Sequence, residues 1–337
     1  MAGLPRAYAT DERLMMQDMA RRFTDEHVLP TANRLDPLQK DIPRSLIEAM
    51  GDLGFFGITI PEKLGGLGLG AFEYCLVAEE LARGWMSVSS LIARGNGFYA
   101  AIPAASEAER RRRTGQMAAG RYLGSLAMSE PDVGSDVASV ACRAVREGDE
   151  WVITGAKYWC TYADEVDFLS VVCRTSDGDG RPARGLTQVV IEKPAGSLPA
   201  HTSGSPIPKI GYFGWKTWEL AFDGARTPVA IQPSAEGRAF YEIAIGLETA
   251  RAHTAARSIG CAQGALDHAT TYAKARVQFG RPIAEFQAVR FKIAAMATEI
   301  QAARQLMYFV CDAIDSGRRC DQEAAAREVS VMPISEG

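Results

Sequence analysis

The sequence predicts an α+β protein with an N-terminal helical domain, a central antiparallel β domain and a C-terminal helical bundle. Apolar residues recur at helical spacing through residues 1–121, and helical spacing returns over residues 234–337. Between them, residues 122–233 contain short β-type runs separated by Gly, Pro and Asp clusters, typical of a small barrel or sandwich. With 337 residues, of which 47% are hydrophobic, the chain is long enough for two or three domains.

The composition excludes several classes of function. A net charge of −4 gives no general attraction to nucleic acid or to anionic membranes, and the basic run at residues 110–113 is interpreted as a solvated helix face. No apolar run approaches the roughly 20 residues of a membrane helix. Seven cysteines without a C-x-x-C pair and four histidines argue against a disulfide framework or a metal site. Without a secretory leader, a reduced cytoplasmic location is expected.

The N-terminal domain begins with two predicted helices and a glycine-rich connector. Thr10 is a candidate N-cap, and Met15, Met19 and Phe23 recur at spacing four, the pattern of one buried face. A second helix is predicted after Pro43, since proline suits a first turn. The connector at residues 61–70 lacks both the G-x-G-x-x-G spacing and a preceding strand, so we interpret it as a flexible turn rather than a phosphate-binding loop.

The central domain combines predicted strands with a candidate cofactor site. Strands are expected at residues 168–173, 187–191 and 218–222, and a hairpin is expected around the turn at residues 147–149.

A polar loop in this domain precedes an aromatic strand. Ser129, Gly134 and Ser135 bring hydroxyls, backbone donors and a residue permissive of positive φ into one short segment, which lets a loop approach a ligand closely. Trp159 and Thr161 then offer a flat ring beside a hydroxyl, suited to a planar heteroaromatic with a hydrogen-bonding edge. On physical grounds alone, an ordinary turn and a core strand explain this pattern equally well.

Two long helices are predicted in the C-terminal domain. Residues 235–275 keep helical spacing without a proline, and residues 284–316 would extend roughly 50 Å. Their alanine-rich faces can pack closely only if further helices cover them. Arg276 begins the turn between the two helices, where its guanidinium could bind a phosphate or cap the carbonyls of the preceding helix.

Several segments, in order along the chain, resemble the acyl-CoA dehydrogenase family. The family's first signature resembles AMSEPDVGSD at residues 127–136, continued by GAKYWCT at residues 155–161. Its second signature resembles RVQFGRPIAEFQ at residues 276–287. The similarity runs from about Asp11 to about Arg327.

The resemblance implies FAD as cofactor and an acyl-CoA thioester as substrate, desaturated between its α and β carbons within fatty acid metabolism. Electron-transferring flavoprotein would accept the electrons, and the chain would form a homodimer or homotetramer. The resemblance implies flavin contacts for Met128, Ser129, Gly134, Ser135, Trp159 and Thr161, and contacts to the ADP half of FAD across a subunit interface for Arg276, Phe279 and Gln287. Substrate contacts are implied for Ser135, Glu248 and Arg251, and no metal is implied.

No catalytic base is identified in the sequence. Desaturation needs a carboxylate that removes the α-proton on the side of the substrate opposite the flavin. In most relatives this glutamate lies well beyond the point where the present chain ends. In a minority it lies at the position of Ala250, which cannot accept a proton. Glu248, two residues away, points to a different helix face.

We therefore expect a C-terminally shortened member of the family with an incomplete bundle, with weak or no FAD and no turnover alone. Two alternatives stay open. One is a non-catalytic subunit of a hetero-oligomeric acyl-CoA dehydrogenase, working with a full-length relative. The other is a flavin-dependent oxidase or monooxygenase of the same fold. Exposed apolar faces on the two long helices would cause poor solubility or require a partner.

Overall fold

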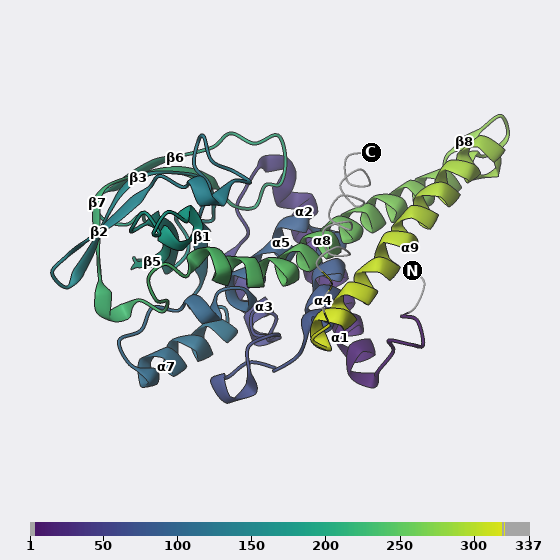
Figure 1. Ribbon diagram of the computed structural model, residues 1–337. Helices are drawn as coiled ribbons and strands as arrows, with labels where there is room; N and C mark the ends of the chain where they lie inside the picture. The colour runs from purple at the N-terminus through teal and green to yellow at the C-terminus, as the bar shows by residue number, and fades with distance from the viewer. Residues whose placement is uncertain (1–3, 319, 321–337) are drawn as a thin grey trace. The chain divides into compact units, whose positions relative to one another are not determined.

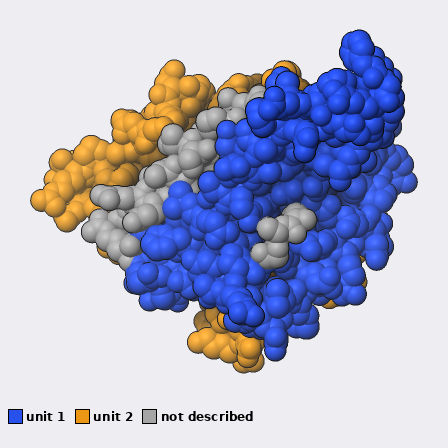
Figure 2. Space-filling model, turned by 90° about the vertical axis from the view of Figure 1, so that its right-hand side faces the viewer, with its two compact units in different colours: residues 1–38, 69–92, 248–337 blue, residues 39–68, 93–247 orange. Residues whose placement is uncertain are grey.

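The computed structural model describes residues 4–318 and residue 320. The chain forms two compact units, which Figure 2 colours separately. Residues 1–38, 69–92 and 248–337 make up the first unit, and residues 39–68 and 93–247 make up the second. The expected end of the C-terminal bundle, at residues 321–337, lies outside the described residues.

The first unit is helical, with one helix at its centre. Its helices are α1 (Asp11–Phe23), α2 (Leu29–Leu35), α4 (Ala71–Gly84), α5 (Met86–Leu91), α9 (Gln287–Asp315) and the part of α8 (Ala239–Ala275) from Glu248 onward. Residues 71–82 of α4 are all buried, and α1 and α9 both contact this helix. Because α4 is covered on all sides, it carries apolar residues around most of its circumference.

Helix α1 begins where the sequence predicts but buries a different face. The Thr10 hydroxyl accepts a hydrogen bond from the Arg13 backbone N–H at 3.2 Å, as an N-cap does. The buried face contains Met16 and Phe23, whereas Met15 is 65% exposed. Phe23 of the predicted face is confirmed and Met19 is half-buried, but Met15 was wrong, because the adjacent Met16 satisfies helical spacing equally well.

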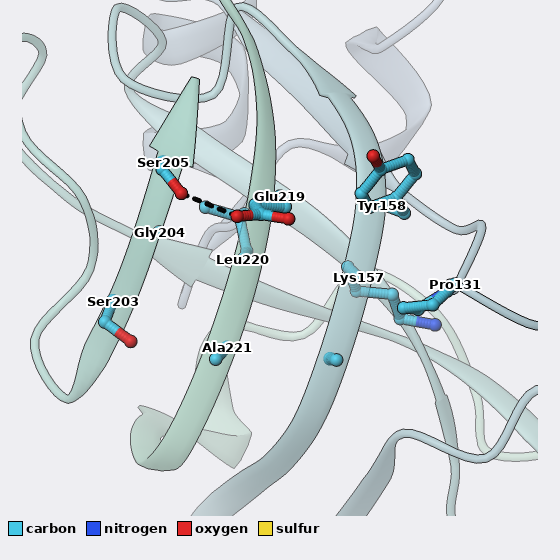
Figure 3. Close-up of a pocket in the computed structure, with 10 residues that line it drawn as sticks. Pro131, Lys157, Tyr158, Ser203, Gly204, Ser205, Glu219, Leu220 and Ala221 are labelled. Atoms are coloured by element: carbon cyan, nitrogen blue, oxygen red, sulfur yellow. Dashed lines mark hydrogen bonds between the residues drawn. The ribbon is translucent and has the colours of Figure 1, made fainter. Parts of the chain in front are cut away.

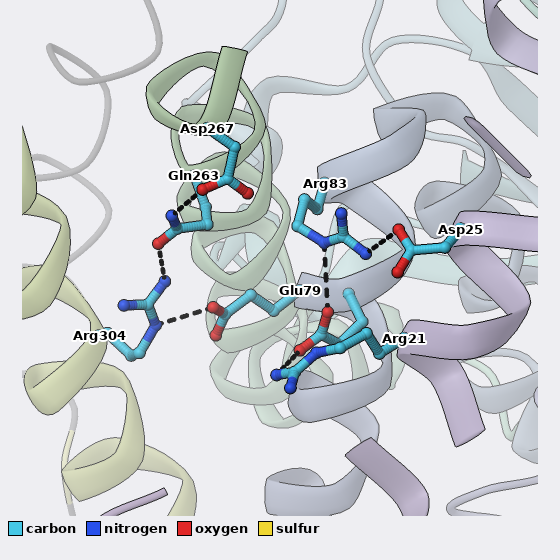
Figure 4. A network of polar contacts seen from close by, with 8 residues as sticks. Arg21, Asp25, Glu79, Arg83, Gln263, Asp267 and Arg304 are labelled. Carbon is cyan, nitrogen blue, oxygen red and sulfur yellow. Dashed lines mark hydrogen bonds and ion pairs between the residues drawn. The ribbon is translucent and has the colours of Figure 1, made fainter. Parts of the chain in front are cut away.

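A buried polar network joins three helices of the first unit (Figure 4). Arg304 on α9 donates to Glu79 on α4 at 2.8 Å and to Gln263 on α8 at 2.9 Å. The side chains of Arg304 and Glu79 are only 5% and 3% exposed. Burial raises the pKa of Glu79, although the Arg304 guanidinium opposes this shift. Removing either partner would leave an uncompensated buried charge.

The second unit contains a single seven-stranded sheet (Figure 1). Its strands are β1 (Gly124–Ala127), β2 (Arg143–Glu147), β3 (Glu150–Thr161), β4 (Phe168–Arg174), β5 (Leu186–Glu192), β6 (Thr202–Pro206) and β7 (Thr217–Pro228). The strand order is β1-β4-β2-β3-β7-β6, and β5 pairs with β4. Helices α3 (Arg44–Asp52), α6 (Ala93–Asn96) and α7 (Glu107–Ala118) and the first turns of α8 also belong to this unit.

Strand pairing in the sheet confirms most of the sequence prediction. Strands β2 and β3 form the expected antiparallel hairpin, with Gly148 in the turn at φ +64°. The three further strands that the sequence predicts correspond to β4, β5 and β7. Two pairings differ from the antiparallel pattern: β1 runs parallel to β4, with Gly124 opposite Phe168, and β2 also pairs with β4 in parallel, with Arg143 opposite Arg174. The intervening hairpin returns the chain to the sheet in the direction of β1, which the strand pattern alone does not reveal.

The two predicted long helices are confirmed as α8 and α9. Their connector folds as a small hairpin of β8 (Val277–Gln278) and β9 (Arg281–Pro282), which Figure 1 shows at one end of both helices. Phe279 and Gly280, at φ +52° and +77°, make its tight turn. The predicted α+β class is therefore confirmed. Within the described part of the chain, no helix is long and apolar enough to span a bilayer.

Candidate functional site

A polar loop lies against the middle strand of the sheet in the second unit. The loop leaves β1 at Met128, and the Ser129 carbonyl accepts a hydrogen bond from the Tyr158 backbone N–H at 2.7 Å. This bond brings Ser129, which follows β1, beside the aromatic segment at the end of β3. The two segments that the sequence singled out are therefore neighbours in space.

The aromatic segment contains a β-bulge at Trp159. Lys157 pairs with Leu220 of β7 and Cys160 pairs with Trp218, so Tyr158 and Trp159 together oppose one residue. Trp159 takes a left-handed conformation at φ +61°, and its side chain is 56% exposed. Bulges redirect side chains, and they are common beside active sites. Here the bulge presents a large aromatic ring to solvent next to the loop.

Thr161 follows two residues after the bulge, at the end of β3. Its carbonyl accepts a hydrogen bond from the Ser125 hydroxyl at 2.6 Å, and Ser125 in turn accepts one from Arg94 at 3.1 Å. Tyr162, the next residue, is again left-handed at φ +64°. Within the described chain, the hydroxyls of Ser129 and Thr161 have no hydrogen-bond partner, so both can donate to a ligand.

The tip of the loop is open to solvent. Gly134 and Ser135 are exposed, and a Cβ added to Gly134 would meet no described atom within 4 Å. Gly134 does not have positive φ, so the loop does not use the conformational freedom that its glycine permits. The space in front of its backbone is what lets a ligand approach. Met128 packs at the other end of the loop, against the core cluster to which Val140 and Val172 belong.

A buried ion pair beneath the loop was not predicted from sequence. Lys157 donates to Glu130 at 2.8 Å, and their side chains are 0% and 8% exposed. Burial alone would raise the pKa of Glu130, but hydrogen bonds from Lys157 and from the backbone of Ala141 and Cys142 outweigh it and lower that pKa. Both residues stand in the motifs that the sequence singled out, yet no local pattern connects them.

A shallow hollow lies beside the loop on the solvent face of β3, β7 and β6 (Figure 3). Its volume is about 400 Å³. Ser205 on β6 donates to Glu219 on β7 at 2.6 Å within it. The lining residues are Pro131, Ala156, Lys157, Tyr158, Ser203, Gly204, Ser205, Glu219, Leu220 and Ala221. Pro131 belongs to the polar loop, so the hollow borders the candidate site.

The first unit contains the other predicted cofactor residues. Arg276 and Phe279 lie in the connector between α8 and α9, and Gln287 is the first residue of α9. All three are exposed. Phe279 is 94% exposed. The Arg276 backbone N–H, not its guanidinium, donates to the Tyr272 carbonyl at 2.8 Å. Capping of the helix by the guanidinium is therefore not observed among the described residues.

The predicted substrate residues lie on α8. Glu248 and Arg251 are half-buried and three positions apart, so they share a helix face. Ala250 is exposed and offers only its carbonyl, which accepts a hydrogen bond from the Thr254 hydroxyl at 2.9 Å. No carboxylate in the described residues is assigned as a catalytic base by this geometry. The described residues contain no group of three or more His, Cys, Asp or Glu side chains that could hold a metal ion.

Fold and site together define a class of protein: a helical domain, a sheet with a hydroxyl-bearing loop beside an exposed tryptophan, and long C-terminal helices. Sequence profiles of the acyl-CoA dehydrogenase N-terminal, middle and C-terminal domains match residues 10–121, 125–225 and 214–332. The chain belongs to the acyl-CoA dehydrogenase family.

Individual relatives agree with this assignment. The chain is 39% identical over 327 residues to (2S)-methylsuccinyl-CoA dehydrogenase of Cereibacter sphaeroides, covering 94% of this chain and 59% of that protein. It is 36% identical over 333 residues to benzylmalonyl-CoA dehydrogenase of Aromatoleum aromaticum, covering 97% and 85%.

Solved structures agree as well. A glutaryl-CoA dehydrogenase in complex with glutaryl-CoA is similar at a TM-score of 0.88 and 30% identity, covering 99% of this chain and 84% of that one. Butyryl-CoA dehydrogenase of Megasphaera elsdenii gives a TM-score of 0.88 at 26% identity, covering 99% and 86%.

Proposed function

We propose that the chain binds FAD and an acyl-CoA and serves the α,β-desaturation of acyl-CoA thioesters. One observation supports this most directly: the backbone bond from Tyr158 to Ser129, which places the hydroxyl-bearing loop beside the exposed Trp159. The family to which the chain belongs, and the CoA thioesters named in its relatives, support the same substrate class.

The residues of the second unit fit a flavin. The hydroxyls of Ser129 and Thr161 would donate to the heteroatoms at the edge of the ring, and Trp159 would lie against its face. Gly134 leaves the backbone open, and the Ser135 hydroxyl beside it would meet the pyrophosphate and the CoA ester. Residues that have room and unpaired donors can bind such a group without rearrangement.

The reaction demands more than flavin binding. Bound flavin supplies a hydride acceptor for the substrate's β-carbon. The protein must hold the thioester and remove its α-proton with a carboxylate. Glu248 and Arg251 would hold the acyl-CoA. Ala250 cannot act as the base, and Glu248 faces another side of α8, so we assign the base to neither.

The second unit's site would be completed by another subunit. Arg276, Phe279 and Gln287 would contact the ADP half of an FAD whose flavin lies in a neighbouring chain, in a homodimer, a homotetramer or an assembly with a full-length relative. All three are exposed, Phe279 by 94%, which supports this arrangement. Because Ala250 stands where some relatives have the base, a non-catalytic subunit that depends on such a relative is the second candidate function. Electron-transferring flavoprotein would accept the electrons.

The test is flavin binding followed by reduction. Purified chain is titrated with FAD, and an acyl-CoA panel is then added without oxygen while flavin absorbance is recorded. We expect the chain alone to bind FAD weakly, and Ser129→Ala with Thr161→Ala to weaken binding further. Ser197→Ala serves as control, since among the described residues that hydroxyl donates to the nearby Pro194 carbonyl alone, at 2.8 Å.

The outcomes separate the candidates. Bleaching by acyl-CoA would establish the dehydrogenase reaction for the chain alone. Binding without bleaching, with activity restored by a full-length relative, would favour the non-catalytic subunit. Steady oxygen consumption with peroxide formation would indicate an oxidase instead. Failure to bind FAD both alone and with such a relative would refute the proposal.

A further inference from the structure

We infer that the buried pair of Glu130 and Lys157 is a clamp that positions the polar loop against β3. Both are positioning residues, since they act through the groups that they hold. The inference rests on the proposed flavin site. It assigns a role to Glu130 and Lys157, neither of which takes part in the chemistry of the reaction.

Lys157 connects the start of the loop to the strand. Its ammonium group is fully buried and donates to the Met128 carbonyl at 2.9 Å and to the Glu130 carboxylate at 2.8 Å. Lys157 is also the last regularly paired residue before the bulge, opposite Leu220. A shift of Lys157 would therefore move both Met128 and the backbone that leads into Trp159.

Glu130 connects the start of the loop to its end. One carboxylate oxygen accepts from the Cys142 backbone N–H at 2.8 Å, and the other accepts from the Ala141 backbone N–H at 2.9 Å. Glu130 also exchanges backbone hydrogen bonds with Val133, at 2.8 and 3.2 Å. The carboxylate thus closes the loop at its base, while Gly134 at the tip stays exposed.

The location of the pair favours a role in positioning the loop over a role in general stabilisation of the fold. Glu130 is the neighbour of Ser129, and Lys157 precedes Tyr158, whose N–H donates to Ser129 at 2.7 Å. A buried ion pair is often no more stabilising than apolar residues of similar size, whereas it fixes one geometry by directional bonds. The clamp therefore holds the Ser129 hydroxyl and the Trp159 ring in one arrangement before flavin binds.

The clamp should depend on pH through the Glu130 carboxylate. The groups that face the Glu130 carboxylate are the Lys157 ammonium and the thiols of Cys142 and Cys173. The folded pKa of Glu130 lies below its ordinary value. Its contribution to the stability of the fold is therefore complete at pH values above the ordinary pKa, and it is lost as the pH falls through the folded pKa. Glu130→Gln removes this dependence.

The experiment uses three clamp variants: Lys157→Met, Glu130→Gln and the double variant that carries both. They are compared with a control variant, Arg304→Met. The control breaks the Arg304–Glu79 pair, also 2.8 Å long and similarly buried, in the first unit. FAD affinity, the visible circular dichroism of bound flavin and the melting temperature of the apoprotein are measured for each. Amide hydrogen exchange at Tyr158 is followed in the apoprotein.

We expect each single clamp variant to weaken FAD affinity at least tenfold, to change the flavin dichroism and to speed exchange at Tyr158. The double variant should recover melting temperature but not affinity, because it removes the unpaired charge without restoring the bonds. Arg304→Met should lower the melting temperature and leave affinity and Tyr158 exchange unchanged.

The inference is overturned if the double variant regains affinity together with stability, or if Arg304→Met weakens flavin binding as much as the clamp variants do. If the unaltered chain binds FAD neither alone nor with a full-length relative, the proposed function fails independently of the clamp. The clamp is then judged by Tyr158 exchange, which must rise in the clamp variants and not in the control.

Discussion

Trp159 is held in a backbone conformation that costs free energy. A left-handed residue other than glycine is disfavoured by roughly 1–2 kcal/mol, because its Cβ lies too close to the following carbonyl oxygen. Trp159, at φ +61°, gains little from burial in return, since its side chain is 56% exposed. Strain of this kind concentrates at functional sites, where the surrounding structure maintains it. The ring therefore faces solvent, where the proposed flavin could contact it.

We predict that Trp159→Gly separates stability from flavin binding. Glycine relieves the left-handed strain but adds roughly 0.5–1 kcal/mol of unfolded-state entropy, so the melting temperature of the apoprotein should stay the same or rise slightly. FAD affinity should fall by about tenfold, the worth of one aromatic contact. Thermal melting and flavin titration measure the two effects.

Trp159→Phe is the matched control for this variant, since it keeps both a ring and the strained backbone. It should retain most of the flavin affinity and show no gain in melting temperature. A marked fall in the melting temperature of Trp159→Gly would contradict the prediction, since it would mean that the indole stabilises the fold.

At the residue scale, the sequence indicated the chemical groups of the candidate site but not the contacts that hold them in place. Ser129, Trp159 and Thr161 were proposed from the sequence because their side chains are unusual together in a short segment. The bulge at Trp159 was not found, because it arises from the register of β3 against β7. Glu130 and Lys157 were missed as a pair, since only the folded sheet brings them to 2.8 Å.

At the scale of elements, glycines decide how closely helix α8 approaches α4. A Cβ at Gly260 would lie 2.2 Å from the Glu79 carbonyl oxygen, and one at Gly264 would lie 2.5 Å from the Arg83 carbonyl oxygen. The helices can keep this approach only without side chains at both positions. At Gly246 of the same helix, a Cβ would meet no described atom within 4 Å.

We predict opposite effects for alanine at two glycines of α8. Gly260→Ala should destabilise the protein by about 1–2 kcal/mol, because α8 and α4 must move apart and better helix propensity only partly compensates. Gly246→Ala should stabilise by about 0.5–1 kcal/mol through propensity alone. Urea unfolding followed by circular dichroism measures both changes. Equal effects of the two substitutions would show that packing against α4 is not what Gly260 provides.

Element prediction succeeded where a single period continues for a long distance. The helices α8 and α9 and the β2–β3 hairpin have clear periods or turn residues, and the structure contains all three. The β8–β9 hairpin and the parallel pairing of β1 with β4 were not predicted. Two-residue strands carry no period, and pairing between distant strands depends on the path of the whole chain.

At the scale of the whole molecule, the proposed cofactor residues belong to two different units. Ser129, Trp159 and Thr161 are in the second unit, and Arg276 and Phe279 are in the first. The β8–β9 end of α8 and α9 also has many exposed apolar side chains, which favour association. These side chains are Tyr272 at 62% exposure, Val277 at 52%, Phe279 at 94%, Phe291 at 64% and Met296 at 38%.

Subunit complementation tests whether one FAD is held by two chains. One variant carries Ser129→Ala and Thr161→Ala, which damage the loop, and the other carries Arg276→Ala and Phe279→Ala, which damage the hairpin. Each variant alone should bind FAD weakly, because every site then lacks one half. After mixing under conditions that exchange subunits, each mixed dimer should contain one intact site and one doubly damaged site. Flavin binding should then rise above the level of either variant, in proportion to the fraction of mixed dimers.

The arrangement within one chain predicts a different result. If a single subunit supplied both the loop and the hairpin to its own FAD, mixing would create no intact site and flavin binding would stay at the average of the two variants. Native mass spectrometry of the mixture measures subunit exchange independently, so that a missing rise in binding is interpreted only when mixed dimers are present. Exchange without recovery would therefore place both halves of the site in one subunit, and it would leave the apolar hairpin face as a surface for association alone.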